Sequence, residues 1–237
     1  MRNKYKIVVT GGSGRFAQSL KKTKSKYKFI YPSKRELDIC SLKSIRSYLK
    51  KTKPKSVLHL AGLSRPMIMH NKKIDLSIKL NIIGTANIVR ICSDLKIKLI
   101  YFSSSYVYPG KKGNYKENDP LLPFNNYAWS KLGGECAVQM YKNSLILRVC
   151  MTEKPFIHKK AFANVKLNFI YHEDLAKIVV KILNKKGVIN VGGPIKSIYK
   201  FAKKDNPNIK KIYVKNNSKN FFPLKCTMNL TKINKII

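Results

Sequence analysis

The segment VVTGGSGRFA, residues 8–17, joins a short apolar run to a glycine-rich turn and then to the start of a helical pattern. Glycine permits a tight turn, and its missing side chain lets a diphosphate approach the backbone N–H groups at the start of a helix. The segment therefore predicts a dinucleotide-binding strand, loop and helix, with a tight turn that binds no ligand as the alternative. The candidate cofactor contacts in this segment are Gly11, Gly14, Arg15 and Phe16.

Apolar runs and helical patterns alternate outward from this segment up to about residue 150. This rhythm predicts an α/β fold with a parallel, doubly wound sheet of the Rossmann type. The right-handed crossover rule then places helices on both faces of the sheet. Further strands are expected at residues 27–31, 56–62, 98–104 and 144–150, and helices at 14–23, 41–54, 72–94 and 126–142.

The alternation breaks after Cys150, where residues 151–168 show no regular pattern. Residues 168–183 indicate a strand that runs into a helix and adds to the sheet, and the tail from residue 205 is polar. We therefore predict a cofactor-binding core at residues 1–150 and a small substrate-binding lobe at 151–237 that interleaves with it. Within the lobe we also expect a strand at 187–193, a helix at 195–204 and a loop at 216–223.

The composition indicates one large domain, or one domain with a small appendage, in a chain of 237 residues. Its five cysteines are widely spaced and odd in number, which fits a reducing compartment and argues against a disulfide framework or a zinc site. The N-terminal apolar run is too short for a signal peptide or a membrane span. We expect a soluble cytoplasmic protein without a metal.

The net charge of +38 raises the possibility of nucleic-acid binding. Only seven of the 49 basic residues are arginine, and the lysines are scattered along the whole chain. Nucleic-acid sites usually concentrate charge on one face and favour arginine for its planar fork. We therefore expect a solvated lysine coat that attracts anionic ligands, rather than a nucleic-acid partner.

The end of the second expected strand would face the adenosine ribose of a dinucleotide. An acidic residue there favours NAD, whereas basic residues accommodate the extra phosphate of NADP. The sequence YPSKRELDI, residues 31–39, has no acid directly at the strand end, which favours NADP over NAD. The candidate contacts are Ser33, Lys34 and Arg35, followed by Asp38 and Ile39 near the adenine.

A tyrosine followed four residues later by a lysine can form a catalytic pair on one helix face. About two such pairs are expected by chance from 13 tyrosines in so lysine-rich a chain, so context must choose among them. Tyr127 and Lys131 lie on a helix just after the fourth strand, which ends in three serines, and Lys131 is expected to lower the pKa of Tyr127. The other two pairs, in a loop and on a late helix, are Tyr108/Lys112 and Tyr199/Lys203.

These motifs together resemble the extended short-chain dehydrogenase/reductase family over nearly the whole chain. The resemblance rests on TGGSGRFA, LDI, HLAG, NIIGTANI, FSSSYVY, YAWSK, FIYHEDLA and VINVGG in the family's order. It implies that Ser104 polarises a carbonyl, that Tyr127 transfers the proton and that Lys131 supports the tyrosine and the cofactor. It also implies roles near the cofactor for Ala61, Gly62 and Asn81.

Within that family the chain is similar to the dTDP-4-dehydrorhamnose reductases, especially in residues 35–62, 106–135 and 223–236. The resemblance implies a reductase of a nucleotide-linked keto-sugar, with a homodimer as a possible assembly and no membrane partner. The alternatives are a nucleotide-sugar epimerase or dehydratase of the same family, and a non-catalytic subunit that binds NAD(P) or a nucleotide sugar. The chain departs from the reductases at Ser105, where an acid is usual, and in a shortened segment between Arg148 and Phe169.

Overall fold

The apolar residues before the glycine turn form β1 (Lys6–Thr10), an interior strand of the central sheet, in a computed structural model that describes residues 5–215 and 222–237. β1 pairs in parallel with β2 (Lys28–Ile30) on one side and β3 (Ser56–His59) on the other. Ile7, Val8 and Val9 are fully buried because helices cover both faces of the strand.

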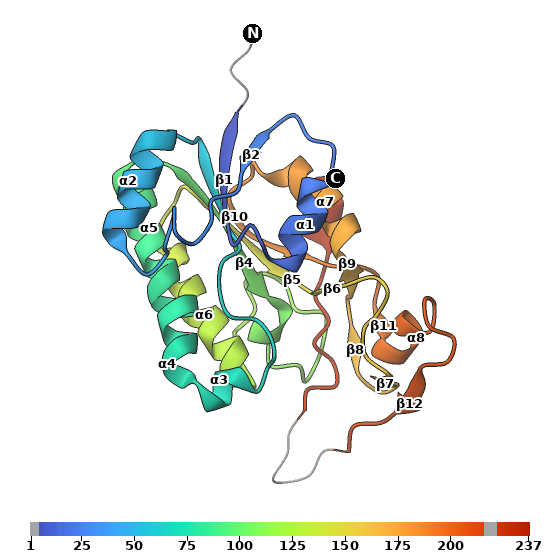
Figure 1. The fold of residues 1–237 in the computed structure, drawn as a ribbon. Coiled ribbons are helices and arrows are strands. Elements are labelled where there is room, and N and C mark those ends of the chain that lie inside the picture. The colour runs from blue at the N-terminus through green and yellow to red at the C-terminus, as the bar shows by residue number, and fades with distance from the viewer. Residues whose placement is uncertain (1–4, 216–221) are drawn as a thin grey trace.

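The described residues build a six-stranded sheet in the order β10-β5-β4-β3-β1-β2, and each pair of neighbours is parallel. β4 (Lys98–Ser104) is buried along its whole length and lies between β3 and β5 (Ser144–Val149). β10 (Gly187–Val191) closes one edge (Figure 1). This confirms the predicted α/β fold with a doubly wound, Rossmann-type sheet.

Helices pack on both faces of the sheet, as the crossover rule predicts. On one face, α1 (Arg15–Lys21) and α7 (His172–Ile182) share a hydrophobic core with the strands. On the opposite face, α2 (Leu42–Thr52), α5 (Gly84–Asp94) and α6 (Asn126–Gln139) form a second core. The two groups lie on either side of the sheet in Figure 1. The carboxyl ends of the strands are thereby left for a ligand.

The helix predicted over residues 72–94 is present, because α4 (Ile74–Ser77) continues through the π-helical η1 (Ile78–Ile83) into α5, which ends at Asp94. Its start lies two residues later than predicted. The short α3 (Met69–Lys72), which precedes it, was not predicted, and it is separated from α4 by Lys73, whose φ of −131° is not helical.

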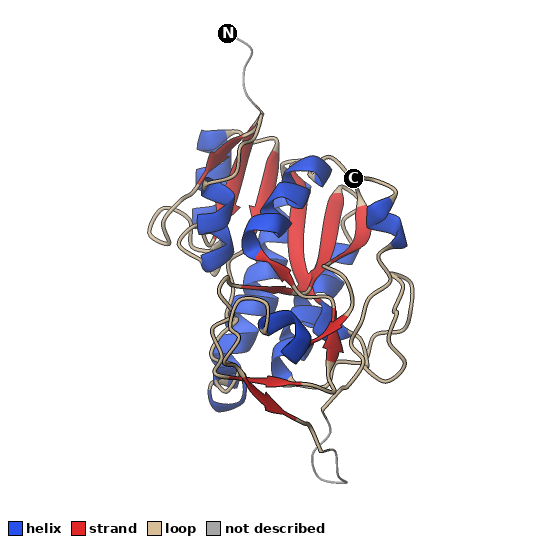
Figure 2. Ribbon diagram, turned by 90° about the vertical axis from the view of Figure 1, so that its right-hand side faces the viewer, coloured by secondary structure: helices blue, strands red, loops and turns tan. Residues whose placement is uncertain are grey.

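Short strands form a small second layer beyond β5, with a hydrophobic core of their own that includes Phe156, Leu167 and Phe201. Figure 2 shows strands of this lobe apart from the central sheet. The paired elements are β6 (Met151–Thr152) with β9 (Ile170–Tyr171), β7 (Lys160–Phe162) with β12 (Lys210–Ile212), and β8 (Lys166–Leu167) with β11 (Lys196–Ser197). The remaining short elements are η2 (Ser105–Val107), α8 (Ile198–Ala202) and α9 (Thr231–Asn234).

One expectation for the second half of the chain needs correction. The strand at the start of residues 168–183 does not join the central sheet, because β9 pairs with β6. The central sheet instead gains β10, which pairs with β5 over five residues. Most of the loop expected at residues 216–223 lies outside the described residues, and the division at residue 150 stays a prediction.

Candidate active site

The glycine turn between β1 and α1 packs directly against the loop that follows β3. Gly11 has a φ of +71°, and a Cβ atom there would lie 2.7 Å from the backbone nitrogen of Ala61. The N–H of Gly14 donates to the Gly11 carbonyl at 2.9 Å, which closes the turn. Glycine is therefore required at Gly11 on two counts, conformation and space. The turn fits a cofactor's diphosphate, because it presents backbone where a side chain would block close approach.

Two of the predicted cofactor contacts are core residues. Phe16 is buried, with its ring centroid 4.8 Å from that of Phe102. Ile39 is also buried and packs so closely on α5 that a Cβ atom at Gly84 would lie 2.8 Å from its side chain. Both side chains support the walls of the candidate site, and their contact with a cofactor stays a prediction.

The loop after β2, residues 31–41, carries Ser33, Lys34 and Arg35 on its exposed surface. The backbone N–H and the hydroxyl of Ser33 donate to the Glu36 carboxylate at 2.7 and 2.8 Å. These bonds lower the pKa of Glu36. The carboxylate of Asp38 accepts the N–H of Cys40 at 3.0 Å. The acid at Glu36 was missed because it stands three residues beyond the strand-end position that sequence reasoning considered.

Ser104, Tyr127 and Lys131 come together at the carboxyl end of β4. Ser104 ends that strand, and its hydroxyl lies close enough to Tyr127, in the first turn of α6, to lower the pKa of that tyrosine. α6 starts there because the Asn125 side chain caps it by accepting the N–H of Ala128 at 2.8 Å. Lys131 follows one turn later, and its ammonium lies 4.2 Å from the centroid of the Tyr101 ring.

Burial governs the charge states of this group. It raises the pKa of Tyr127, against the opposing effects of the Ser104 hydrogen bond and the charge of Arg65. It also lowers the pKa of Lys131 to about 7, although the Glu135 carboxylate opposes this. The expected lowering of the Tyr127 pKa by Lys131 is therefore wrong in this structure, because desolvation is the larger effect.

The other two tyrosine–lysine pairs have different surroundings. Tyr108 is fully buried, and its lysine, Lys112, turns away to form an ion pair with Asp119 at 3.1 Å. Lys203 lies 5.7 Å from the ring centroid of Tyr199 in the small lobe, away from the ends of the central strands. The geometry thus favours Tyr127 over both, as the sequence context does.

A buried chain of hydrogen bonds connects the glycine turn to η1. Ala61 donates its N–H to the Thr10 hydroxyl at 3.2 Å, and that hydroxyl lies 2.7 Å from His59 Nδ1. The other ring nitrogen of His59 lies 3.1 Å from the hydroxyl of Thr85, which itself donates to the Asn81 carbonyl at 2.8 Å. The Thr85 hydroxyl must therefore accept a hydrogen bond that the protonated Nε2 of His59 donates, which fixes the tautomer of that ring. Burial lowers the pKa of His59 to about 3, so its ring is neutral.

Asn81 extends this chain to the candidate proton donor. Its side-chain oxygen accepts the N–H of Leu63 at 2.7 Å, and its amide nitrogen donates to Leu63 O and to the Ser130 hydroxyl at 2.8 Å. Ser130 in turn donates to the carbonyl of Tyr127 at 2.7 Å. Asn81 therefore braces the loop after β3 against α6, and its role near the cofactor stays a prediction. A Cβ atom at Gly62 would lie 2.7 Å from its side-chain oxygen.

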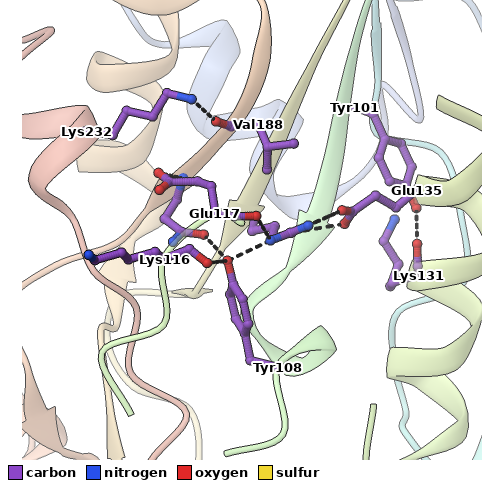
Figure 3. A network of polar contacts seen from close by, with 10 residues as sticks. Tyr101, Tyr108, Lys116, Glu117, Lys131, Glu135, Val188 and Lys232 are labelled. Carbon is purple, nitrogen blue, oxygen red and sulfur yellow. Dashed lines mark hydrogen bonds and ion pairs between the residues drawn. The ribbon is translucent and has the colours of Figure 1, made fainter. Parts of the chain in front are cut away.

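A second buried network lies one turn beyond Lys131 (Figure 3). Glu135 forms an ion pair of 2.6 Å with Arg148 of β5, and both side chains are almost completely buried. Arg148 also donates to the Tyr108 hydroxyl at 2.7 Å and to the Glu117 carbonyl at 2.9 Å. The Tyr108 hydroxyl reaches the side chain of Asn190 on β10. Sequence reasoning missed this network, whose members are distant in the chain.

No group of three or more His, Cys, Asp or Glu side chains in residues 5–215 and 222–237 could hold a metal ion. Across the same residues, no helix has the length and apolar character that a membrane span requires.

Comparison with known proteins finds a matching protein family and solved structures with a similar fold. The model of the family described as "RmlD substrate binding domain" matches residues 5–185. The chain also superimposes on the crystal structure of dTDP-4-dehydrorhamnose reductase from Bacillus anthracis in complex with NADP, with a TM-score of 0.85 and 21% identity. The superposition covers 99% of this chain and 92% of that one.

Curated relatives match in sequence over shorter stretches. Methionine adenosyltransferase 2 subunit beta from Xenopus laevis is 31% identical over 114 residues, which are 48% of this chain and 34% of that protein. GDP-6-deoxy-D-talose 4-dehydrogenase from Aggregatibacter actinomycetemcomitans is 32% identical over 145 residues, or 58% of this chain and 48% of the enzyme. The matched stretches thus span between a third and a half of the length of these relatives.

Proposed function

The chain belongs to the family described as RmlD substrate binding domain, and from this membership we propose that it is an NAD(P)-dependent reductase of a nucleotide-linked keto-sugar. The observation that carries the proposal is the proximity of the Ser104 and Tyr127 side chains at the end of β4, with Lys131 one helical turn further on. Two hydroxyl groups at the carboxyl end of a parallel strand can hold and protonate a carbonyl oxygen, which ketone reduction requires.

Tyr127 acts as the general acid in this proposal. Its raised pKa keeps the phenol protonated at neutral pH, so a proton is available for the oxygen on which negative charge develops. Ser104 donates a hydrogen bond to the same oxygen, and Lys131 supports the tyrosine and the cofactor. A bound nicotinamide would supply the hydride.

The cofactor preference that we propose is NADP. The exposed side chains of Lys34 and Arg35 stand in the loop after β2, where the extra phosphate of NADP is expected. Ser33 already donates its hydroxyl to Glu36, so the two basic side chains supply the discrimination. The reductase from Bacillus anthracis with a similar fold is described in complex with NADP.

We assign the substrate-covering role to residues 151–237. α7 and β10 of this segment belong to the central sheet and its core, but another part, which includes Phe156, Leu167 and Phe201, packs in a third hydrophobic core. That part can form one wall of a binding site beside β5. The names of the relatives, a dTDP-4-dehydrorhamnose reductase and a GDP-6-deoxy-D-talose 4-dehydrogenase, support a nucleoside diphosphate sugar as the substrate class.

The test is a screen of nucleotide-linked keto-sugars with NADPH and with NADH, followed at the nicotinamide absorbance and by product analysis. We expect net oxidation of NADPH and a product alcohol with at least one substrate. Conversion of the sugar without net consumption of the nicotinamide would indicate the epimerase or dehydratase alternative, which returns the hydride.

A non-catalytic subunit is the second candidate, because several relatives are named as subunit beta of methionine adenosyltransferase 2. The placement of Ser104 beside Tyr127 argues for the enzyme, since a binding module has no need of a proton donor. Cofactor binding without conversion of any nucleotide sugar, for wild type and Tyr127→Phe alike, would favour the subunit.

A further inference from the structure

The carboxylate of one residue, Glu153, forms ion pairs with two arginines from different elements near the glycine turn. Glu153, just after β6, lies 2.9 Å from Arg15, the first residue of α1. Both oxygens of the same carboxylate also accept hydrogen bonds from Arg65, in the loop after β3, at 2.9 and 2.8 Å. The sequence predicts Arg15 only as a cofactor contact, and it predicts no role for Arg65 or Glu153.

This cluster lies between the glycine turn and the candidate proton donor. Arg15 directly follows Gly14, which closes the turn. The positive charge of Arg65 lowers the pKa of Tyr127, so the two groups lie within electrostatic reach of each other. Arg15 and Arg65 also both act on the pKa of His172, at the start of α7. The pair of arginines thus lies near both the glycine turn and Tyr127, the two places that a diphosphate-containing ligand must join to bring its reactive end to Tyr127.

The exposure of the three side chains indicates that an incoming anion can reach the arginines and displace the carboxylate. The arginine side chains are 49% and 33% exposed, whereas that of Glu153 is 16% exposed. Ion pairs with such exposed members are individually weak. A diphosphate carries more negative charge than one carboxylate and offers more oxygens to the planar arginine forks. A diphosphate can therefore compete with Glu153 for both arginines.

We propose that Arg15 and Arg65 form a diphosphate-binding pair and that Glu153 is its internal counter-ion, which the ligand displaces. This inference rests on the proposed function. It adds to that function by naming Glu153 as a residue that limits the affinity of the site for a diphosphate. The Glu153 carboxylate keeps the two arginines ordered without ligand, but its negative charge must leave the pair before a diphosphate enters. The diphosphate belongs either to the cofactor or to the nucleotide sugar.

The test compares Glu153→Gln with wild type in binding inorganic pyrophosphate, NADPH and a nucleoside diphosphate, each measured by calorimetry. Glu173→Gln is the matched control, because Glu173 is exposed on α7 and makes no ion pair with either arginine among the described residues. We expect Glu153→Gln to bind pyrophosphate about three- to tenfold more tightly than wild type. Glu173→Gln should stay within about twofold of wild type.

The two organic ligands identify the source of the diphosphate. If Glu153→Gln binds NADPH more tightly than wild type but not the nucleoside diphosphate, the arginine pair binds the cofactor. If it binds only the nucleoside diphosphate more tightly, the pair binds the sugar nucleotide. Tighter pyrophosphate binding by Glu153→Gln, in a chain that binds neither organic ligand, would keep the arginine pair and overturn the proposed function instead.

Arg65→Gln provides a second test that does not depend on the stability of Glu153→Gln. Loss of that arginine should weaken pyrophosphate binding about fivefold or more, because one of the two cationic partners is removed. Unchanged pyrophosphate affinity in Arg65→Gln would overturn the proposal. Equal or weaker binding of pyrophosphate by a folded Glu153→Gln would overturn it as well, because Glu153 would then help the site rather than compete with it.

Discussion

The carboxyl edge of the sheet is built differently at β4 and at β2. Beside β4, polar groups such as His59, Asn81 and Ser130 are buried, and each is held by hydrogen bonds to neighbouring elements. In the loop after β2, Lys34 and Arg35 extend into solvent. One end of the proposed dinucleotide site is therefore fixed by the interior of the protein, and the other end relies on exposed charge.

This difference separates two kinds of effect. Buried networks hold side chains in one geometry and are costly to break, because an orphaned partner stays desolvated. Exposed charges are screened by salt and contribute to affinity and choice of ligand. We therefore expect changes beside β4 to alter turnover or folding, and changes in the loop after β2 to alter cofactor preference.

The largest effect is expected from Tyr127→Phe. Removal of the phenolic hydroxyl takes away the proposed general acid while the ring keeps its place beside His70, at a centroid distance of 5.1 Å. The turnover number should fall about 10²–10⁴-fold with cofactor affinity unchanged within a few fold. Steady-state kinetics and NADPH titration measure the two quantities.

Tyr199→Phe is the control for this change, since it removes a tyrosine hydroxyl that also has a lysine four residues later. Its turnover should stay close to that of wild type. Retention of more than half the wild-type turnover by Tyr127→Phe would end the catalytic assignment. It would also contradict the expectation that changes beside β4 alter turnover.

The second prediction concerns folding. Glu135→Gln leaves the buried guanidinium of Arg148 without its charge partner, and such a change typically costs about 3–5 kcal/mol. The free energy of unfolding, measured in urea, should fall by about that amount. The double change Glu135→Leu with Arg148→Met removes both charges and should cost less than the single change. A single change that costs under about 1 kcal/mol would show that water or Tyr108 compensates Arg148.

Much of the core could be predicted from the sequence because its signals are local. The apolar run of β1, the glycine turn and the tyrosine–lysine pair on α6 each occupy a few consecutive residues with a recognisable period. The pairing of β10 with β5 was missed, as were the Glu135–Arg148 pair and the two arginines at Glu153. Each of these joins residues from different elements of the fold, and a local pattern carries no information about such partners. The short α3 was missed as a separate helix because its four residues are too few to show a period.

The third prediction tests the exposed edge. Lys34→Ala combined with Arg35→Ala should weaken the binding of NADPH much more than that of NADH, because only NADPH carries the 2′-phosphate. Charge-assisted hydrogen bonds contribute about 1.5–3 kcal/mol each, so we expect the preference for NADPH to shift by tenfold or more at low salt. The shift should shrink as salt is added. Equal losses for both cofactors would show that these side chains do not contact that phosphate.

The fourth prediction concerns Lys131→Met, read as a function of pH. Burial lowers the pKa of Lys131 to about 7 in the folded chain, whereas the ordinary value for lysine is 10.5. Between these values the unfolded chain binds more protons, so the free energy of unfolding rises with pH in this window. Below about pH 7 both states carry the charge and the cost of burying it is fully present; above about pH 10.5 neither state carries it.

Lys131→Met should therefore stabilise the chain relative to wild type near pH 6.5, and the advantage should shrink towards about pH 9.5. Urea unfolding at the two pH values measures the difference. Lys34→Met, which removes an exposed lysine from the loop after β2, gives the baseline for losing one positive charge. A stability difference for Lys131→Met that does not vary with pH would mean that Lys131 is solvated as well as the lysines of the exposed edge. The contrast between the two edges would then not extend to this residue.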